Sequence, residues 1–110
     1  MQVVDRISNQ LAIHPIVLFM KGTPGRPMCQ GSHAAVEALK DCGAQFHAID
    51  VQKDPEIRAY LPKFSNLHGL PQLFLQGELI GSADIVVDLW RQGELAAMVE
   101  QCQSLQAIAS

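Results

Sequence analysis

The sequence predicts an α/β domain in which a four-stranded mixed sheet is flanked by helices on both faces. Apolar residues recur at the helical period in some segments and form short runs or alternate in others, which gives the order α-β-α-β-α-β-β-α. A strand–helix–strand unit then precedes a hairpin, and this combination places parallel and antiparallel pairs in one sheet. At 110 residues, the chain is predicted to form one domain over residues 1–110.

Periodicity and turn residues place the elements of the first half of the chain. They are a helix over 2–13, a strand over 16–20, a helix over about 29–42 and a strand over 46–51. Pro15 ends the first helix because the residue before a proline is pushed out of the α region. Gly43 ends the second helix, since glycine readily adopts the left-handed conformation that follows a helix.

The second half of the chain is read in the same way. Its elements are a helix from 54 to about 64, strands over 70–75 and 78–80, a helix from 84, and a further helical segment over 95–102. Asp54 and Pro55 begin the first of these helices as N-cap and first-turn proline. Gly77 marks the hairpin turn, and Asp84 is predicted to be the N-cap of the next helix. The whole order resembles that of a thioredoxin-like domain.

Composition and charge exclude several classes of function. The net charge is −3, the basic residues are spread singly, and only 5% of residues are aromatic, so no surface for nucleic acid is predicted. No apolar run approaches the ~18 residues that cross a bilayer. Asp5 and Arg6 interrupt the region where a signal peptide would be apolar. We therefore expect a cytoplasmic protein that binds neither nucleic acid nor membranes.

Three cysteines stand far apart, which is not the spacing of a zinc site or a disulfide framework. Cys29 begins a helix after a loop rich in glycine and proline, where free amides and the helix dipole favour a thiolate. Lys21 can add a positive charge. These features favour a reactive thiol over the alternative, a small buried hydrophobic residue. Cys42 and Cys102 continue apolar helical stripes and are predicted to lie in the core.

Ser32 stands three residues after Cys29, where a two-cysteine redox protein would carry its second thiol. Serine cannot form a disulfide, so any disulfide of Cys29 needs a thiol from outside the loop, and the hydroxyl can instead cap the helix or bond to the sulfur. His33 shares a helical face with Cys29, but two ligands are too few for a metal site. Pro71 fits either a strand end or a cis peptide bond, and the residues alone leave that choice open.

Several segments together resemble a monothiol glutaredoxin. They are residues 20–29 (MKGTPGRPMC) with Ser32, 55–58 (PEIR), 70–74 (LPQLF), 77–81 (GELIG) and 84–86 (DIV), and the similarity extends over about residues 1–102. The resemblance implies a thioredoxin-like fold, glutathione bound beside the cysteine, and a [2Fe–2S] cluster held between two protomers. A cluster needs four ligands, which two cysteines and two glutathione thiols would complete.

The resemblance also implies roles for individual residues. Cys29 would be the thiol nucleophile or the cluster ligand. The implied glutathione site consists of Lys21, Arg58, Leu70, Pro71, Ala83 and Asp84. Within it, Lys21 and Arg58 would pair with a glutathione carboxylate and Asp84 with the γ-glutamyl end. The backbone of Leu70, before a cis proline, would pair with glutathione as an added strand does.

The chain departs from the family pattern in three loops. Where the family has Cys-Gly-Phe-Ser, this chain has Cys-Gln-Gly-Ser at residues 29–32. Residues 67–69 (LHG) replace Trp-Pro-Thr, and residues 81–84 (GSAD) replace Gly-Gly-Cys-Asp or Gly-Gly-Ser-Asp. The ionic positions are kept, so we expect the thiol-peptide site to persist with a changed shape. A cluster in it is expected to be more solvent-accessible and more labile than is usual in the family.

Three functions follow, in order of preference. The first is a glutathione-dependent [2Fe–2S] carrier or sensor that serves iron–sulfur acceptor proteins, as a monomer without the cluster and a homodimer around it. The second is a thiol-disulfide oxidoreductase, at most a weak one, that acts on glutathione mixed disulfides by a monothiol mechanism. The third is a divergent interaction module that has lost both activities.

Overall fold

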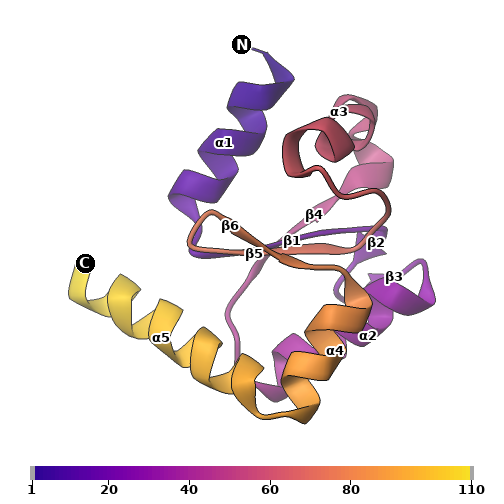
Figure 1. The fold of residues 1–110 in the computed structure, drawn as a ribbon. Helices are drawn as coiled ribbons and strands as arrows, with labels where there is room; N and C mark the ends of the chain where they lie inside the picture. Colours follow the sequence, from indigo (N-terminus) through magenta and orange to yellow (C-terminus); the bar gives the residue numbers. More distant parts are fainter. Residues whose placement is uncertain (1, 110) are drawn as a thin grey trace.

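A four-stranded sheet forms the middle layer of the molecule (Figure 1). The computed structural model describes residues 2–109, with side chains as far as residue 105. In sheet order the strands are β4 (His47–Asp50), β1 (Ile16–Met20), β5 (Gln72–Leu75) and β6 (Glu78–Gly81). β1 runs parallel to β4 and antiparallel to β5, and β5 pairs antiparallel with β6. The sheet is therefore mixed, as the sequence predicts.

Helices cover both faces of this sheet (Figure 1). On one face lie α1 (Val3–Ile13) and α3 (Pro55–Ser65), and on the other lie α2 (Gln30–Asp41), α4 (Ala83–Arg91) and α5 (Glu94–Ala109). A short 3₁₀ helix, η1 (Val51–Lys53), joins β4 to α3. Within the described residues, no helix has both the length and the apolar character needed to cross a membrane.

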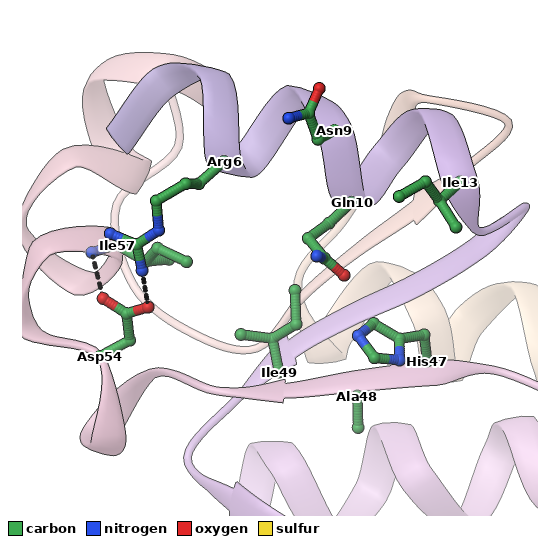
Figure 2. Close-up of a pocket in the computed structure, with 9 residues that line it drawn as sticks. All are labelled: Arg6, Asn9, Gln10, Ile13, His47, Ala48, Ile49, Asp54 and Ile57. Atoms are coloured by element: carbon green, nitrogen blue, oxygen red, sulfur yellow. Dashed lines mark hydrogen bonds and ion pairs between the residues drawn. The ribbon is translucent and has the colours of Figure 1, made fainter. Parts of the chain in front are cut away.

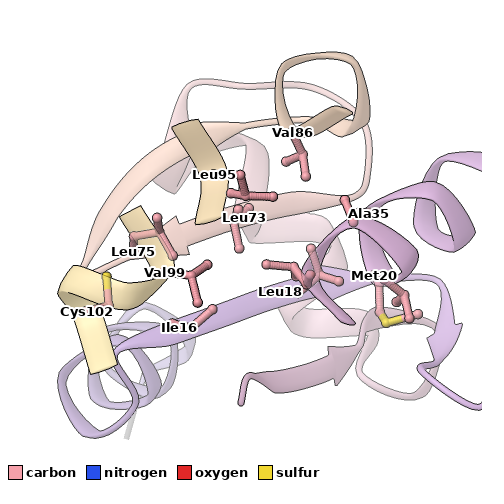
Figure 3. Packing of buried hydrophobic residues seen from close by; sticks show 13 residues of the cluster. Ile16, Leu18, Met20, Ala35, Leu73, Leu75, Val86, Leu95, Val99 and Cys102 are labelled. Atoms are coloured by element: carbon pink, nitrogen blue, oxygen red, sulfur yellow. The ribbon is translucent and has the colours of Figure 1, made fainter. Parts of the chain in front are cut away.

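The central strand β1 divides the core in two, because successive side chains of a strand point to opposite faces. Ile16, Leu18 and Met20 pack against α2, α4 and α5 (Figure 3), whereas Val17 and Phe19 pack beneath α1 and α3. All five residues of β1 are buried. β1 is therefore held firmly in the core, and the loop that leads to Cys29 begins at the end of this strand.

The predicted elements are confirmed, with differences at some of their ends and in the loops. β5 begins at Gln72 rather than at residue 70, and Val51, predicted to end a strand, begins η1. The predicted N-cap Asp84 instead lies in the first turn of α4, whose N-cap is Ser82; a carboxylate there still faces the positive end of the helix. The last helix extends to Ala109 rather than ending near residue 102. A small hairpin of β2 (Gly22–Thr23) and β3 (Arg26–Pro27) forms part of the loop before α2. Strands of two residues leave no hydrophobic alternation to detect in the sequence.

Candidate thiol site

Cys29 is the N-cap residue of α2 and follows the β2–β3 hairpin after one residue, Met28. The hairpin depends on Gly22, which has a φ of +90° and whose Cα lies so close to the opposite strand that an added Cβ would be 2.4 Å from the carbonyl oxygen of Arg26. The amide of Met28 then donates to the carbonyl of Lys21 at 2.9 Å and closes the loop. The loop thus presents the cysteine between the end of β1 and the start of α2.

Ser32 holds the sulfur of Cys29 in place. Its amide donates to Sγ at 3.3 Å, and its hydroxyl oxygen lies 3.1 Å from Sγ. The same hydroxyl accepts a hydrogen bond from the amide of Lys21 at 3.1 Å, and the Ser32 side chain is fully buried. The predicted contact between the serine and the sulfur is confirmed, and the serine also ties α2 to the end of β1.

The pKa of the Cys29 thiol is lowered, which favours the thiolate. Partial burial alone would raise this pKa, but other groups outweigh burial: the Ser32 hydroxyl and amide, the positive charge of Lys21, and the amide of Gly31. Burial raises the pKa values of Cys42 and Cys102, which pack against and within the core. Of the three thiols, Cys29 alone has the character of a nucleophile or a metal ligand.

We expect Ser32→Ala to raise the pKa of Cys29 and to slow its alkylation by iodoacetamide severalfold at neutral pH. The hydroxyl would no longer donate to the thiolate, so a smaller fraction of the thiol would be ionised near pH 7. The two rates should converge at high pH, where both thiols are ionised. Rate against pH, followed by mass spectrometry, checks this, and parallel profiles with equal midpoints would contradict it.

A cavity of about 170 Å³ gathers three of the predicted residues, among them Lys21, whose charge acts on the Cys29 thiol. It is lined by Lys21, Arg58, Leu61, Pro62, Gly69, Leu70 and Gln72. Lys21 and Arg58 thus place two positive charges next to the backbone of Leu70. The Leu70–Pro71 peptide bond is cis, which settles the choice that the residues alone leave open.

A second, wider hollow of about 580 Å³ lies on the α4 side of the site. It is lined by Gln30, Gly31, Ala34, Ala83, Asp84, Val87, Asp88 and Arg91. Gly31 lies against both the cis-proline loop and α4, because a Cβ added to it would lie 3.1 Å from Pro71 Cδ and 3.4 Å from Ala83 Cβ. Of the predicted residues, Lys21, Arg58 and Leu70 therefore line the first cavity and Ala83 and Asp84 the second, whereas Cys29 and Pro71 line neither, and Pro71 lies against Gly31.

Among the residues of the first cavity that sequence reasoning misses, Gln72 is the buried polar one. Its side-chain amide donates to the carbonyls of Leu67 and Gly69 at 2.8 and 3.1 Å, and so holds the loop that carries Leu70. Gln72 is 1% exposed, and its Oε1 has no hydrogen-bond partner among the described residues. The available signal was a single polar residue in the otherwise apolar strand QLFL.

Neither the histidines His33 and His47 nor the cavity between α1, α3 and β4 adds a residue to the predicted site. His33 lies near Glu37, and among the described residues no group of three histidine, cysteine or acidic side chains could hold a metal ion. A cavity of about 500 Å³ between α1, α3 and β4 is lined in part by Arg6, His47 and Asp54 (Figure 2) and contains none of the predicted site residues. His47 stacks on His14 with ring centroids 3.9 Å apart.

A mixed sheet with helices on both faces, and a cysteine that caps the helix whose first turn meets a cis proline, define a thioredoxin-like domain with a single thiol at its site. The family model Glutaredoxin matches residues 16–80. Glutaredoxin 4 of Buchnera aphidicola is 42% identical over 105 residues, covering 96% of this chain and 97% of the relative. Glutaredoxin 4 of Escherichia coli K12 is 43% identical over 98 residues, covering 89% and 85%. The chain belongs to the glutaredoxin family, as a monothiol member.

Solved structures agree on the fold. Reduced apo GrxS14 of poplar has a TM-score of 0.80 at 32% identity, covering 93% of this chain and 94% of that one. A monomeric truncated mutant of Trypanosoma brucei 1-C-Grx1 has a TM-score of 0.81 at 31% identity, covering 92% of both chains. A buckwheat glutaredoxin, solved as a glutathione complex, has a TM-score of 0.80 at 22% identity and covers 91% and 89%.

Proposed function

We propose that the protein binds glutathione across the start of α2, beside Cys29. The observation that carries this proposal is the pairing of a cationic cavity with Lys21 and Arg58 on one side of the thiol and a cavity with Asp84 on the other. None of the ion pairs within residues 2–105 involves these three side chains, so their charges are available to a ligand. Glutathione has carboxylates at both ends and an ammonium at the γ-glutamyl end, which matches this distribution.

We further propose that two chains share a [2Fe–2S] cluster, which they carry to iron–sulfur acceptor proteins or use for sensing. Such a cluster takes four thiolate ligands, and only Cys29 of this chain has a thiol that is both partly accessible and lowered in pKa. One chain therefore supplies one of the four thiolate ligands. A second copy and two glutathione thiols would supply the rest, and the bound cluster would serve as cargo. A cytoplasmic location, rich in reduced glutathione, fits this proposal.

The lowered pKa of Cys29 favours one second function, monothiol attack on a glutathione mixed disulfide. The Cys29 thiolate would attack the glutathione sulfur of the substrate, form a Cys29–glutathione disulfide and release the substrate thiolate. A second glutathione thiolate would then attack this disulfide, freeing Cys29 and leaving oxidised glutathione. Ser32 cannot resolve the intermediate, so the second glutathione is required.

Anaerobic reconstitution with iron, sulfide and glutathione tests these functions. A [2Fe–2S] absorption spectrum with dimer mass that needs glutathione, and that fades within hours in air, would support the carrier. A colourless monomer that binds glutathione and turns over a glutathionylated peptide would establish the oxidoreductase instead. A folded protein that does neither would refute both and leave an interaction module.

Arg58→Gln is expected to weaken glutathione binding about tenfold, because it removes one of two cations that would face a carboxylate. Lys63→Gln is the matched control: it lies on the same helix, is exposed, makes the same change of charge and does not line the cavity. Isothermal titration with glutathione gives both affinities. Equal losses of glutathione affinity in the two variants would mean that the net charge alone causes the effect. An unchanged affinity in Arg58→Gln would show that Arg58 does not belong to the glutathione site.

A further inference from the structure

The flank of Cys29 formed by the β2–β3 hairpin and η1 contains a groove that the proposed glutathione site does not use. Its volume is about 350 Å³, and it is lined by Gly22, Thr23, Arg26, Met28, Asp50, Gln52 and Lys53. Met28 precedes Cys29 and is 58% exposed. The groove is therefore lined by the residue that precedes Cys29 in the chain, although Cys29 itself does not line it.

Two cations without an ion-pair partner among the described residues line this groove. Arg26 and Lys53 are exposed, and neither takes part in an ion pair within the part of the chain that the structure describes. The carboxylate of Asp50 also lines the groove, but its Oδ1 already accepts hydrogen bonds from the amides of Gly22 and Gln52, both at 3.0 Å. An incoming carboxylate would therefore meet two cations that have no ion-pair partner within residues 2–105 and one carboxylate, that of Asp50, which already accepts two hydrogen bonds.

Positive charge continues from the groove to the neighbouring cavity. Lys21 adjoins Gly22 of the groove and lines the cationic cavity with Arg58. These two, with Arg26 and Lys53, are four of the eight lysine and arginine residues in a chain whose net charge is −3. The opposite flank carries Asp84 and Asp88 with Arg91 and has no such excess. Half of the basic residues thus line this groove and the cavity next to it.

We propose that this groove docks an acidic segment of a partner protein and so brings the partner's cysteine to Cys29. Arg26 and Lys53 would attract the carboxylates, and Met28 would contact an apolar side chain between them, since methionine adapts to varied surfaces. The inference rests on the proposed function in one respect, that Cys29 is the reacting group. It adds that partners are selected by acidic residues near the cysteine they present.

Titration of the ¹⁵N-labelled protein with a short glutamate–leucine peptide, in low salt, tests the docking. We expect amide shifts at Arg26, Met28 and Lys53, and binding that weakens as salt is added. Arg26→Glu and Lys53→Glu should each weaken binding about fivefold. Lys40→Glu is the matched control, with the same change of net charge at an exposed site about 15 Å along α2 from its start. Its affinity should stay within about twofold of the unmodified protein.

Three results would overturn the proposal: shifts that avoid the groove, equal weakening by Lys40→Glu, or equal binding of a lysine–leucine peptide. Glutathione titrated into the same samples separates this inference from the function on which it rests. Arg26→Glu and Lys53→Glu should leave glutathione binding intact. If the protein binds the peptide in the groove but not glutathione, the proposed function fails while the docking surface stands. If it binds glutathione but not the peptide, the docking surface fails alone.

Discussion

Cys29→Ser is expected to abolish cluster assembly and mixed-disulfide turnover completely while leaving the fold intact. Serine is close to cysteine in size, and the side chain lies at the N-cap of α2, a position that serine favours. A hydroxyl, however, is neither a thiolate ligand nor a nucleophile at neutral pH, and the environment that lowers the pKa of the thiol cannot ionise it. Reconstitution, turnover of a glutathionylated peptide and far-ultraviolet circular dichroism together check this expectation.

The matched control for this variant is Cys42→Ser. Cys42 is a partly buried C-cap residue of the same helix, and its pKa is raised by burial. It should lose some stability but keep both activities. If the Cys42→Ser variant lost the cluster and Cys29→Ser kept it, the assignment of the reactive thiol would be wrong. If Cys29→Ser kept glutathione affinity, the binding cavities would be shown to act without the sulfur.

The fold was predictable because each element has a local signature that agrees with its packing. The five apolar residues of β1 predict a fully buried strand, and all five are buried. Asp54 accepts a hydrogen bond from the amide of Ile57, as its position before Pro55 predicts for an N-cap. Asp84 shows the limit of such rules, because an acidic residue fits both the N-cap and the first turn. The shift to Ser82 depends on the turn from β6, which no single residue specifies.

The thiol itself was predictable from local features, because Cys29 begins a helix and Ser32 lies one turn further on, whereas the surrounding cavity residues were predictable only from a family motif. The position of Lys21, Arg58 and Asp84 around the thiol follows from that resemblance, whereas their division between two cavities does not. That division arises where Gly31 meets the cis proline loop and α4, a contact between segments far apart in the chain. Gln72 is a similar case, because its bonds to the 67–69 loop are set by tertiary packing. Spacing in the sequence carries no information on such contacts.

The β2–β3 hairpin before Cys29 helps to position the thiol, and Gly22 is the residue of this hairpin at which a substitution is expected to disturb it most. We expect Gly22→Ala to lower the free energy of unfolding by about 2–5 kcal/mol, since it combines strain at positive φ with overpacking. The added Cβ would lie 2.4 Å from the carbonyl oxygen of Arg26 and 2.9 Å from the amide nitrogen of Met28. Both are backbone atoms, so the strands of the hairpin would have to separate. Urea unfolding measures the loss.

Gly25→Ala is the control for Gly22→Ala. It replaces a glycine of the same loop at a position where the added Cβ has no close neighbour. Gly25 lies between the two strands of the same hairpin, and a Cβ added there has no atom within 4 Å. The free energy of unfolding of this variant should lie within about 1 kcal/mol of that of the parent protein. Because Met28 and Cys29 follow the hairpin directly, Gly22→Ala should also change the reactivity of the thiol, whereas Gly25→Ala should not. Equal stability of the two variants would mean that the hairpin yields easily, and that the position of Cys29 is fixed by Ser32 and α2 alone.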